Sequence, residues 1–189
     1  MKKAIKGAIA AAGAGVLLLG GAGTLAYWTA DGTADGSDIT AGDLDLTAGT
    51  CSGWTYAAGS AGGGAAVTLF VPGDEITRTC TFGLQATGDN LAATIAAPAT
   101  VPVRGAGTTS FSASAATTFA IASGTPTASR VLADGGTITS ADDGGTITAT
   151  FVVSIPPGNE TTINANDTQN IVASLDDMTV SLQQADPNP

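Results

Sequence analysis

The sequence contains no histidine and is short of basic and aromatic residues. Its 189 residues include six Lys and Arg against 16 Asp and Glu, and aromatic residues make up 5% of the chain. Without imidazole the chain cannot build a Ser-His-Asp triad, a histidine-ligated zinc site or a histidine proton shuttle. With a formal net charge of -10 it lacks the positive face that nucleic-acid binding requires. We therefore expect no bound nucleic acid, no metal and no other cofactor.

The few basic residues are concentrated at the start of the chain. Lys2, Lys3 and Lys6 precede an apolar run over 8–23, and no further charge occurs until Asp31. A basic segment followed by an apolar segment is typical of a helical secretory signal peptide. The alternative is an uncleaved membrane anchor, because the uncharged stretch is long enough to cross roughly 30 Å of hydrocarbon. Its high Gly and Ala content favours the signal peptide.

Small residues follow the apolar run at the two positions that a signal peptidase reads. Thr24 and Ala26 occupy these positions, which predicts cleavage between Ala26 and Tyr27 and a signal peptide over 1–26. The remaining chain would hold three arginines against 16 acidic residues, a net charge of −13. Self-repulsion would keep such a chain soluble. We expect a secreted protein with no stable membrane anchor after cleavage.

Two cysteines, Cys51 and Cys80, are the only ones in the sequence. In an exported chain an even pair predicts a structural disulfide. A metal site is a poor alternative, because two thiolates without histidine fall short of four ligands. A redox role is also disfavoured, because the spacing is far from C-x-x-C.

Apolar residues alternate with polar ones over most of the chain, and no stretch holds a helical period. Alternation is clearest over 75–84, where Arg78 falls on the apolar side and should reach water near a strand end. Further strands are expected at 39–46, 67–71, 91–97, 111–121, 146–155, 171–175 and 178–183. The alternation changes parity at Gly42-Asp43 and at Asp176-Asp177, where we expect a bulge or turn.

These short strands and frequent turn signals predict an all-β fold, a jelly-roll-like antiparallel β-sandwich. The Pro72-Gly73-Asp74 sequence predicts a turn, and the Gly/Ala/Ser/Thr-rich segments 57–66 and 104–110 predict loops. We assign the sandwich to residues 39–185. A flexible segment over 27–38 precedes it, and a tail over 186–189 follows it.

Acidic residues are the first candidates for chemistry. Asp31, Asp35 and Asp38 superficially resemble a calcium loop, but the terminal glutamate of an EF-hand is missing, so a solvated linker is favoured. Adjacent carboxylates occur at Asp74-Glu75, Asp142-Asp143 and Asp176-Asp177. Neighbours in sequence rarely face each other across a substrate, so we interpret these pairs as turn and edge charges and expect no enzyme.

Two aromatic residues, Trp54 and Tyr56, follow Cys51 closely. Packing of Trp54 against the disulfide is the simpler interpretation. An exposed platform that stacks on sugar rings is the alternative, and it would make the protein a secreted polysaccharide- or surface-binding module.

Three segments, taken together, resemble the TasA/camelysin family. The first is the junction Gly20-Gly21-Ala22-Gly23-Thr24-Leu25-Ala26-Tyr27-Trp28, and the second is Ile39-Thr40-Ala41-Gly42-Asp43-Leu44-Asp45-Leu46. The third is Val71-Pro72-Gly73-Asp74 leading into a long strand. The resemblance covers residues 15–95 and is closest to actinobacterial proteins with an alternate-type, SipW-cognate signal peptide.

The resemblance implies a jelly-roll sandwich, processing by a SipW-like signal peptidase and assembly into extracellular fibres of a biofilm matrix. In such fibres the mature N-terminus of one subunit completes a sheet of its neighbour, which places Tyr27, Trp28, Thr29 and Ala30 in the donor segment. The Gly- and Asp-rich residues that follow are poor strand formers. The cysteine pair is also foreign to the fibre-forming pattern. Camelysins carry a metalloprotease label, which a chain without HExxH or histidine does not support.

Overall fold

The computed structural model describes residues 32–105, 110–123, 128–158, 169–170 and 172–187. The chain divides into two units, Met1–Ile39 and Thr40–Pro189. In the first unit the described residues 32–39 are exposed and form no helix or strand. The fold described below is that of the second unit.

The second unit is all-β, as the alternation predicts. Its elements are β1 (Asp43–Cys51), β2 (Thr55–Tyr56), β3 (Glu75–Thr87), β4 (Ala92–Ala96), β5 (Thr100–Gly105), β6 (Ser110–Ser123), β7 (Ala128–Ala133), β8 (Thr137–Thr139), the 3-10 helix η1 (Ser140–Asp142), β9 (Thr146–Ser154), β10 (Ala173–Leu175) and β11 (Ser181–Gln184). All of the described strand pairs are antiparallel.

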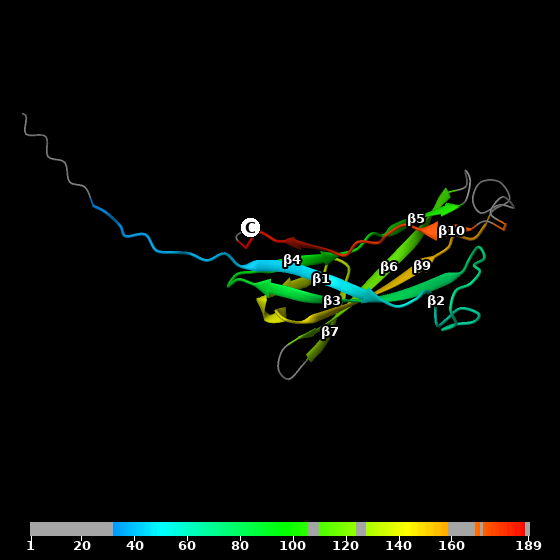
Figure 1. Ribbon diagram of the computed structural model, residues 1–189, viewed down its shortest axis with the longest axis horizontal. Coiled ribbons are helices and arrows are strands. Elements are labelled where there is room, and N and C mark those ends of the chain that lie inside the picture. Colours follow the sequence, from blue (N-terminus) through cyan, green and yellow to red (C-terminus); the bar gives the residue numbers. More distant parts are fainter. Residues whose placement is uncertain (1–31, 106–109, 124–127, 159–168, 171, 188–189) are drawn as a thin grey trace, which may run out of the picture. The chain divides into compact units, whose positions relative to one another are not determined.

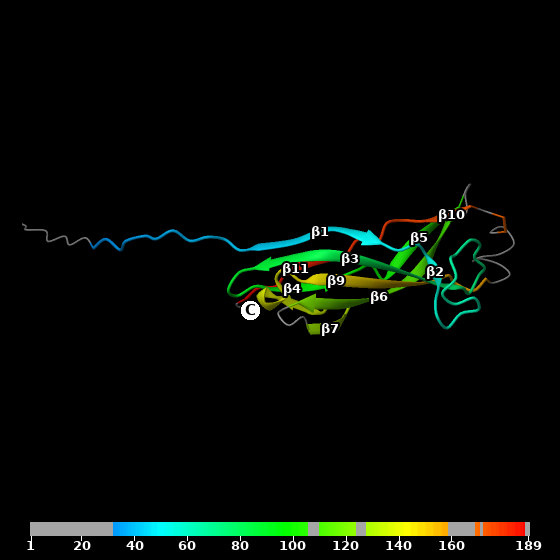
Figure 2. The same ribbon diagram turned by 60° about the horizontal axis from the view of Figure 1, so that its bottom comes forward.

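The larger of the two sheets contains eight strands. Six of them follow the order β1-β3-β9-β6-β5-β10, while β2 pairs with β3 and β7 pairs with β6. Strands β3, β9 and β6 run side by side, and β1 lies outside β3 (Figures 1 and 2). Along β9, buried and half-buried residues alternate, which is the period of two expected of a sheet with one face in the core.

The smaller sheet has the order β11-β4-β8 and packs against part of the larger one. Ile95 of β4 and Ile138 of β8 are buried in one cluster with Phe119 of β6 and Ile147 of β9. The two sheets therefore share a core, which makes the unit a β-sandwich. Each buried aliphatic or aromatic side chain of this kind stabilises the fold by roughly 1.5–3 kcal/mol.

A second cluster is built mainly on strands β3, β5, β6 and β9 of the large sheet. It contains Ile76, Val101, Val103, Ala113, Val153 and Ile155. Trp54, Phe70 and Met178 pack against it from outside the longer strands. Met178 also packs against the first cluster, so the connection from β10 to β11 crosses between the two halves of the core.

The structure corrects two predicted strands. Residues 67–71 are irregular, because Val67 bonds to the Trp54 carbonyl and Val71 is held by the Asp74 side chain. Residues 39–41 lie outside β1, and Ile39 is 93% exposed. The alternation therefore changes at Gly42-Asp43 because β1 begins there. The register between β1 and β3 is irregular at a different place, between Thr47 and Thr50.

The last strand is also shorter than predicted. Residues 178–180 form no strand, and β11 begins at Ser181. The change of alternation at Asp176-Asp177 marks the point where the chain leaves β10 of the large sheet for β11 of the small one. The predicted Pro72-Gly73-Asp74 turn is confirmed, with Gly73 at a φ of 94° that favours glycine.

Candidate functional site

The outer edge of β1 is open along the described residues. On β3, the Leu84 amide donates to the Gly145 carbonyl at 2.9 Å and the Ala86 amide donates to Asp143 Oδ1 at 2.8 Å, both away from β1. The opposite residues of β1, Leu46 and Leu44, are therefore in non-hydrogen-bonded pairs. Their backbone N–H and C=O groups point outward, and no described strand pairs with them.

The neighbouring strand β2 lies on the same side of β3, but its outer edge is covered. The Tyr56 amide donates to the Ala65 carbonyl, and the Val67 amide donates to the Trp54 carbonyl, both at 3.0 Å. The open edge therefore extends along β1 and ends where β2 begins. It carries two acidic side chains, Asp43 and Asp45, which discourage pairing of this edge with itself.

The predicted disulfide forms between Cys51 of β1 and Cys80 of β3. The two cysteines are direct partners in the β1–β3 register. Next to them, the Ser52 amide donates to the Thr79 carbonyl at 2.8 Å. The covalent bond therefore fixes the end of the edge strand to the interior of the large sheet.

A hollow of about 310 Å³ lies beside the disulfide. Its lining residues come from β1, the β1–β2 connection, β3, β9, β10 and the β10–β11 connection: Cys51, Trp54, Arg78, Cys80, Phe82, Phe151, Leu175, Asp176, Asp177 and Met178. The Arg78 guanidinium lies 5.8 Å from the centre of the Trp54 ring, and its Nε donates to the Ser52 carbonyl at 2.9 Å. Arg78 is half-buried, is the fourth residue of β3 and lies opposite Phe151 of β9 in the register.

The two predicted platform residues lie in different surroundings. Trp54 is half-buried and lines the hollow together with the disulfide, as well as packing against both core clusters. Tyr56 does not line the hollow. Its ring packs against the second cluster, and its hydroxyl donates to the Leu69 carbonyl. Of the two predicted platform residues, only Trp54 lines this hollow. The sequence did not indicate that Arg78 and Asp177 line it as well.

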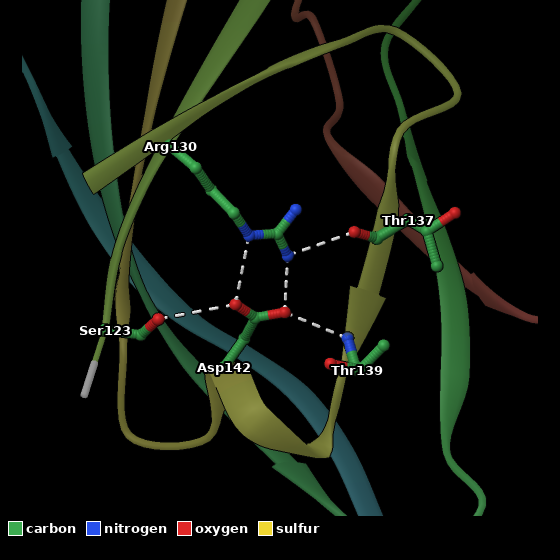
Figure 3. Close-up of polar contacts among 5 residues, drawn as sticks. All are labelled: Ser123, Arg130, Thr137, Thr139 and Asp142. Atoms are coloured by element: carbon green, nitrogen blue, oxygen red, sulfur yellow. Dashed lines mark hydrogen bonds and ion pairs between the residues drawn. The ribbon is translucent and has the colours of Figure 1, made fainter. Parts of the chain in front are cut away.

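The ion pair in Figure 3, between an exposed arginine and a buried aspartate, joins the two sheets. Arg130 of β7 contacts Asp142 of η1 with an Nη2–Oδ2 distance of 2.5 Å, and the same nitrogen donates to the Thr137 carbonyl of β8. Asp142 Oδ2 also accepts from the Thr139 amide at 2.9 Å, and Oδ1 accepts from Ser123 Oγ at 3.3 Å. This carboxylate has no oxygen left for a substrate, so its role is structural.

The environment of Asp142 changes its acidity in two opposite directions. Burial of the carboxyl raises its pKa, while the Thr139 amide, Arg130 and Ser123 stabilise the anion and lower it. The hydrogen bonds and the cation prevail, so the pKa of Asp142 lies below its usual value.

A second ion pair, at the surface, holds the β10–β11 connection. Arg104 of β5 donates to Asp176 through Nε at 2.7 Å and through Nη2 at 2.6 Å. The hydrogen bonds from Arg104 lower the pKa of Asp176. Asp74 caps the 71–74 turn and Asp143 accepts from the Ala86 amide, so each adjacent carboxylate pair of the sequence has at least one member in a structural contact.

The remaining predicted site residues lie outside the described residues. These are the cleavage positions Thr24, Ala26 and Tyr27 and the donor residues Trp28, Thr29 and Ala30. Within the described ranges, no three His, Cys, Asp or Glu residues gather as metal ligands. In the same ranges no helix combines the length and apolarity needed to span a membrane.

Comparisons with known proteins give no relative for this chain. No family model, no curated protein and no solved structure matches it.

Proposed function

We propose that the protein is a secreted structural subunit, similar to TasA, of an extracellular fibre or biofilm matrix. In this proposal the N-terminal segment of one copy, beginning at Tyr27 after signal-peptide cleavage, adds as a strand to β1 of the next copy. One observation carries the proposal: the open edge of β1, with the backbone groups of Leu44 and Leu46 directed outward. Strand addition gains its affinity from such main-chain hydrogen bonds.

The side-chain charges of β1 and of Tyr27–Ala30 favour pairing of β1 with the N-terminal segment of another copy over pairing of β1 with a second β1. Asp43 and Asp45 of two β1 strands would meet across a two-fold axis, and like charges in cross-strand positions are destabilising. The segment Tyr27–Ala30 is uncharged in its side chains and contains two aromatic residues. These four residues therefore meet the acidic edge without repulsion, whereas the rest of the donor carries Asp31, Asp35 and Asp38.

The length of the proposed donor suits the acceptor. At about 3.3 Å per residue, the twelve residues 27–38 span roughly 40 Å, whereas the nine residues of β1 span roughly 30 Å. The residues 32–39 are exposed and unpaired in the first unit, so no internal pairing has to be broken for them to join a neighbour. The disulfide at Cys51 stabilises the acceptor edge.

Negative-stain microscopy of residues 27–189, with and without residues 27–36, tests the proposal. We expect fibres from the longer chain and monomers from the shorter one, which retains every described strand. A synthetic peptide of residues 27–38 should also shorten the fibres, because it caps free β1 edges, and a peptide with aspartates at positions 27 and 28 is the matched control. Fibres that form equally well without residues 27–36 would refute strand donation by this segment.

A further inference from the structure

The hollow beside the disulfide combines an apolar floor with polar groups at its rim. Phe82, Phe151, Leu175 and Met178 supply hydrocarbon and sulfur surface, and the Trp54 ring forms part of the lining. Pockets for small molecules have volumes of roughly 300–1,000 Å³, so a hollow of 310 Å³ suits one small ring.

Arg78 supplies hydrogen-bond donors to this hollow. Its Nε is used by the Ser52 carbonyl, but no described residue accepts a hydrogen bond from its two terminal nitrogens. In the described part of the chain the ion pairs are those of Arg104 and Arg130, so Arg78 has no carboxylate partner there. Its stacking on Trp54 fixes the guanidinium near the ring.

Asp177 supplies the complementary acceptors. It lines the same hollow, is exposed, and has no cation within ion-pair distance among the described residues. Its neighbour Asp176 is already held by two nitrogens of Arg104. The rim thus offers N–H donors from Arg78 and carboxylate acceptors from Asp177 around an apolar, aromatic interior.

We propose that this hollow binds one ring of a neutral saccharide. A sugar ring presents a C–H face to Trp54 and the apolar floor, and its hydroxyls can accept from Arg78 or donate to Asp177. A purely apolar ligand would give neither the free donors of Arg78 nor the carboxylate of Asp177 a hydrogen-bond partner. An anionic ligand would meet two aspartates and a chain of net charge -10. The site is separate from the open edge of Leu44 and Leu46 and does not depend on fibre assembly.

Titration of the ¹⁵N-labelled full chain with sugars, followed by NMR, tests this site. Glucose, galactose, mannose and N-acetylglucosamine, with a neutral tetramer of each, are the probes. The chain has two tryptophans, so a Trp28→Phe variant identifies the indole N–H resonance of Trp54. We expect a saturable shift of that resonance with at least one neutral sugar.

Variants of the rim separate a specific site from general surface binding. Asp177→Asn should weaken binding about tenfold or more, because it removes a charged acceptor from the sugar hydroxyls. Asp89→Asn, an exposed aspartate in a turn away from the hollow lining, should leave binding unchanged. Asp177 has no hydrogen bond among the described residues, so its variant should keep the fold, which circular dichroism checks.

Three outcomes would overturn the proposal. The first is no Trp54 shift with any of the sugars at tens of millimolar. The second is a shift of equal affinity in Asp177→Asn and the unchanged chain. The third is tighter binding of sodium glucuronate or of free leucine than of every neutral sugar, which would assign the hollow to an anion or a zwitterion.

Discussion

Arg130 and Asp142 link the two sheets of the sandwich through a contact of 2.5 Å between Nη2 and Oδ2. The Asp142 side chain is 5% exposed, whereas that of Arg130 is 43% exposed. Among the described residues Asp142 is the buried charged group, and it holds η1, β7 and β8 together through Arg130 and Thr139. One carboxylate therefore adds a polar link between the sheets to the apolar core that they share.

Asp142→Ala should lower the free energy of unfolding by roughly 2–3 kcal/mol. The change removes the acceptor of the Thr139 N–H and the carboxylate partner of Arg130, and loss of a hydrogen bond to a charged group costs about 1.5–3 kcal/mol. Urea unfolding followed by circular dichroism measures the difference. Asp89→Ala, at an exposed turn position, is the control and should stay within about 0.5 kcal/mol of the unchanged chain. Equal stability of the two variants would contradict a structural role for Asp142.

The same contact makes stability depend on pH in a defined direction. Because the folded pKa of Asp142 lies below the reference value of 3.8, the carboxylate stabilises the fold fully above that value. This stabilisation is lost as the pH falls through the lower, folded pKa. The gap in unfolding free energy between the unchanged chain and Asp142→Asn should thus be constant from pH 7 to about pH 5 and shrink below pH 4. A gap that widens in acid would contradict the direction of the shift.

Sequence periodicity predicted the central strands of this fold but not the contacts between them. The alternation over 75–84, 111–121 and 146–155 corresponds to β3, β6 and β9, because each strand has one face in the core. The disulfide followed from cysteine count and export. The Val67–Val71 alternation was misleading, because the Asp74 side chain and the Trp54 carbonyl hold these residues in other conformations.

The polar contacts between distant residues could not be predicted from the sequence, for a different reason. Asp142-Asp143 had the composition of a turn, and nothing local indicated that Arg130 from a separate strand would bury one of the two carboxylates. Arg78 and Asp177 are almost a hundred positions apart, and only the crossing of the β10–β11 connection brings both to one hollow. Contacts of this kind depend on strand order, which alternation does not encode.

Loss of the Cys51–Cys80 disulfide should destabilise the second unit. The bond closes a loop with a sequence separation of 29, for which the chain-entropy model gives roughly 3–4 kcal/mol. We expect the double variant Cys51→Ser, Cys80→Ser to show this loss in urea unfolding, with fraying concentrated in β1. Hydrogen exchange should show the β1 amides that face β3, such as that of Asp45, losing protection before those of β9. Unchanged protection of β1 would show that pairing with β3 alone holds the edge.

Removal of one unsatisfied hydroxyl should stabilise the protein. Thr117 Oγ1 on β6 is the buried side-chain polar atom without a hydrogen-bond partner in the described part of the chain. Thr117→Val keeps the shape of the side chain and replaces that hydroxyl with a methyl group, so the free energy of unfolding should rise by about 1 kcal/mol. Thr118→Val, on the exposed side of the same strand, is the control and should change stability little. A destabilised Thr117→Val variant would indicate a water partner at this hydroxyl.

Residue-resolved hydrogen exchange on monomers and assembled protein tests the central claim most directly. In the monomer the amides of Leu44 and Leu46 point away from β3, so they should exchange quickly, while that of Asp45 faces β3 and should be protected. Assembly by strand addition predicts that Leu44 and Leu46 become protected and that Asp45 changes little. Assembled protein in which Leu44 and Leu46 still exchange as fast as in the monomer would contradict strand addition at β1.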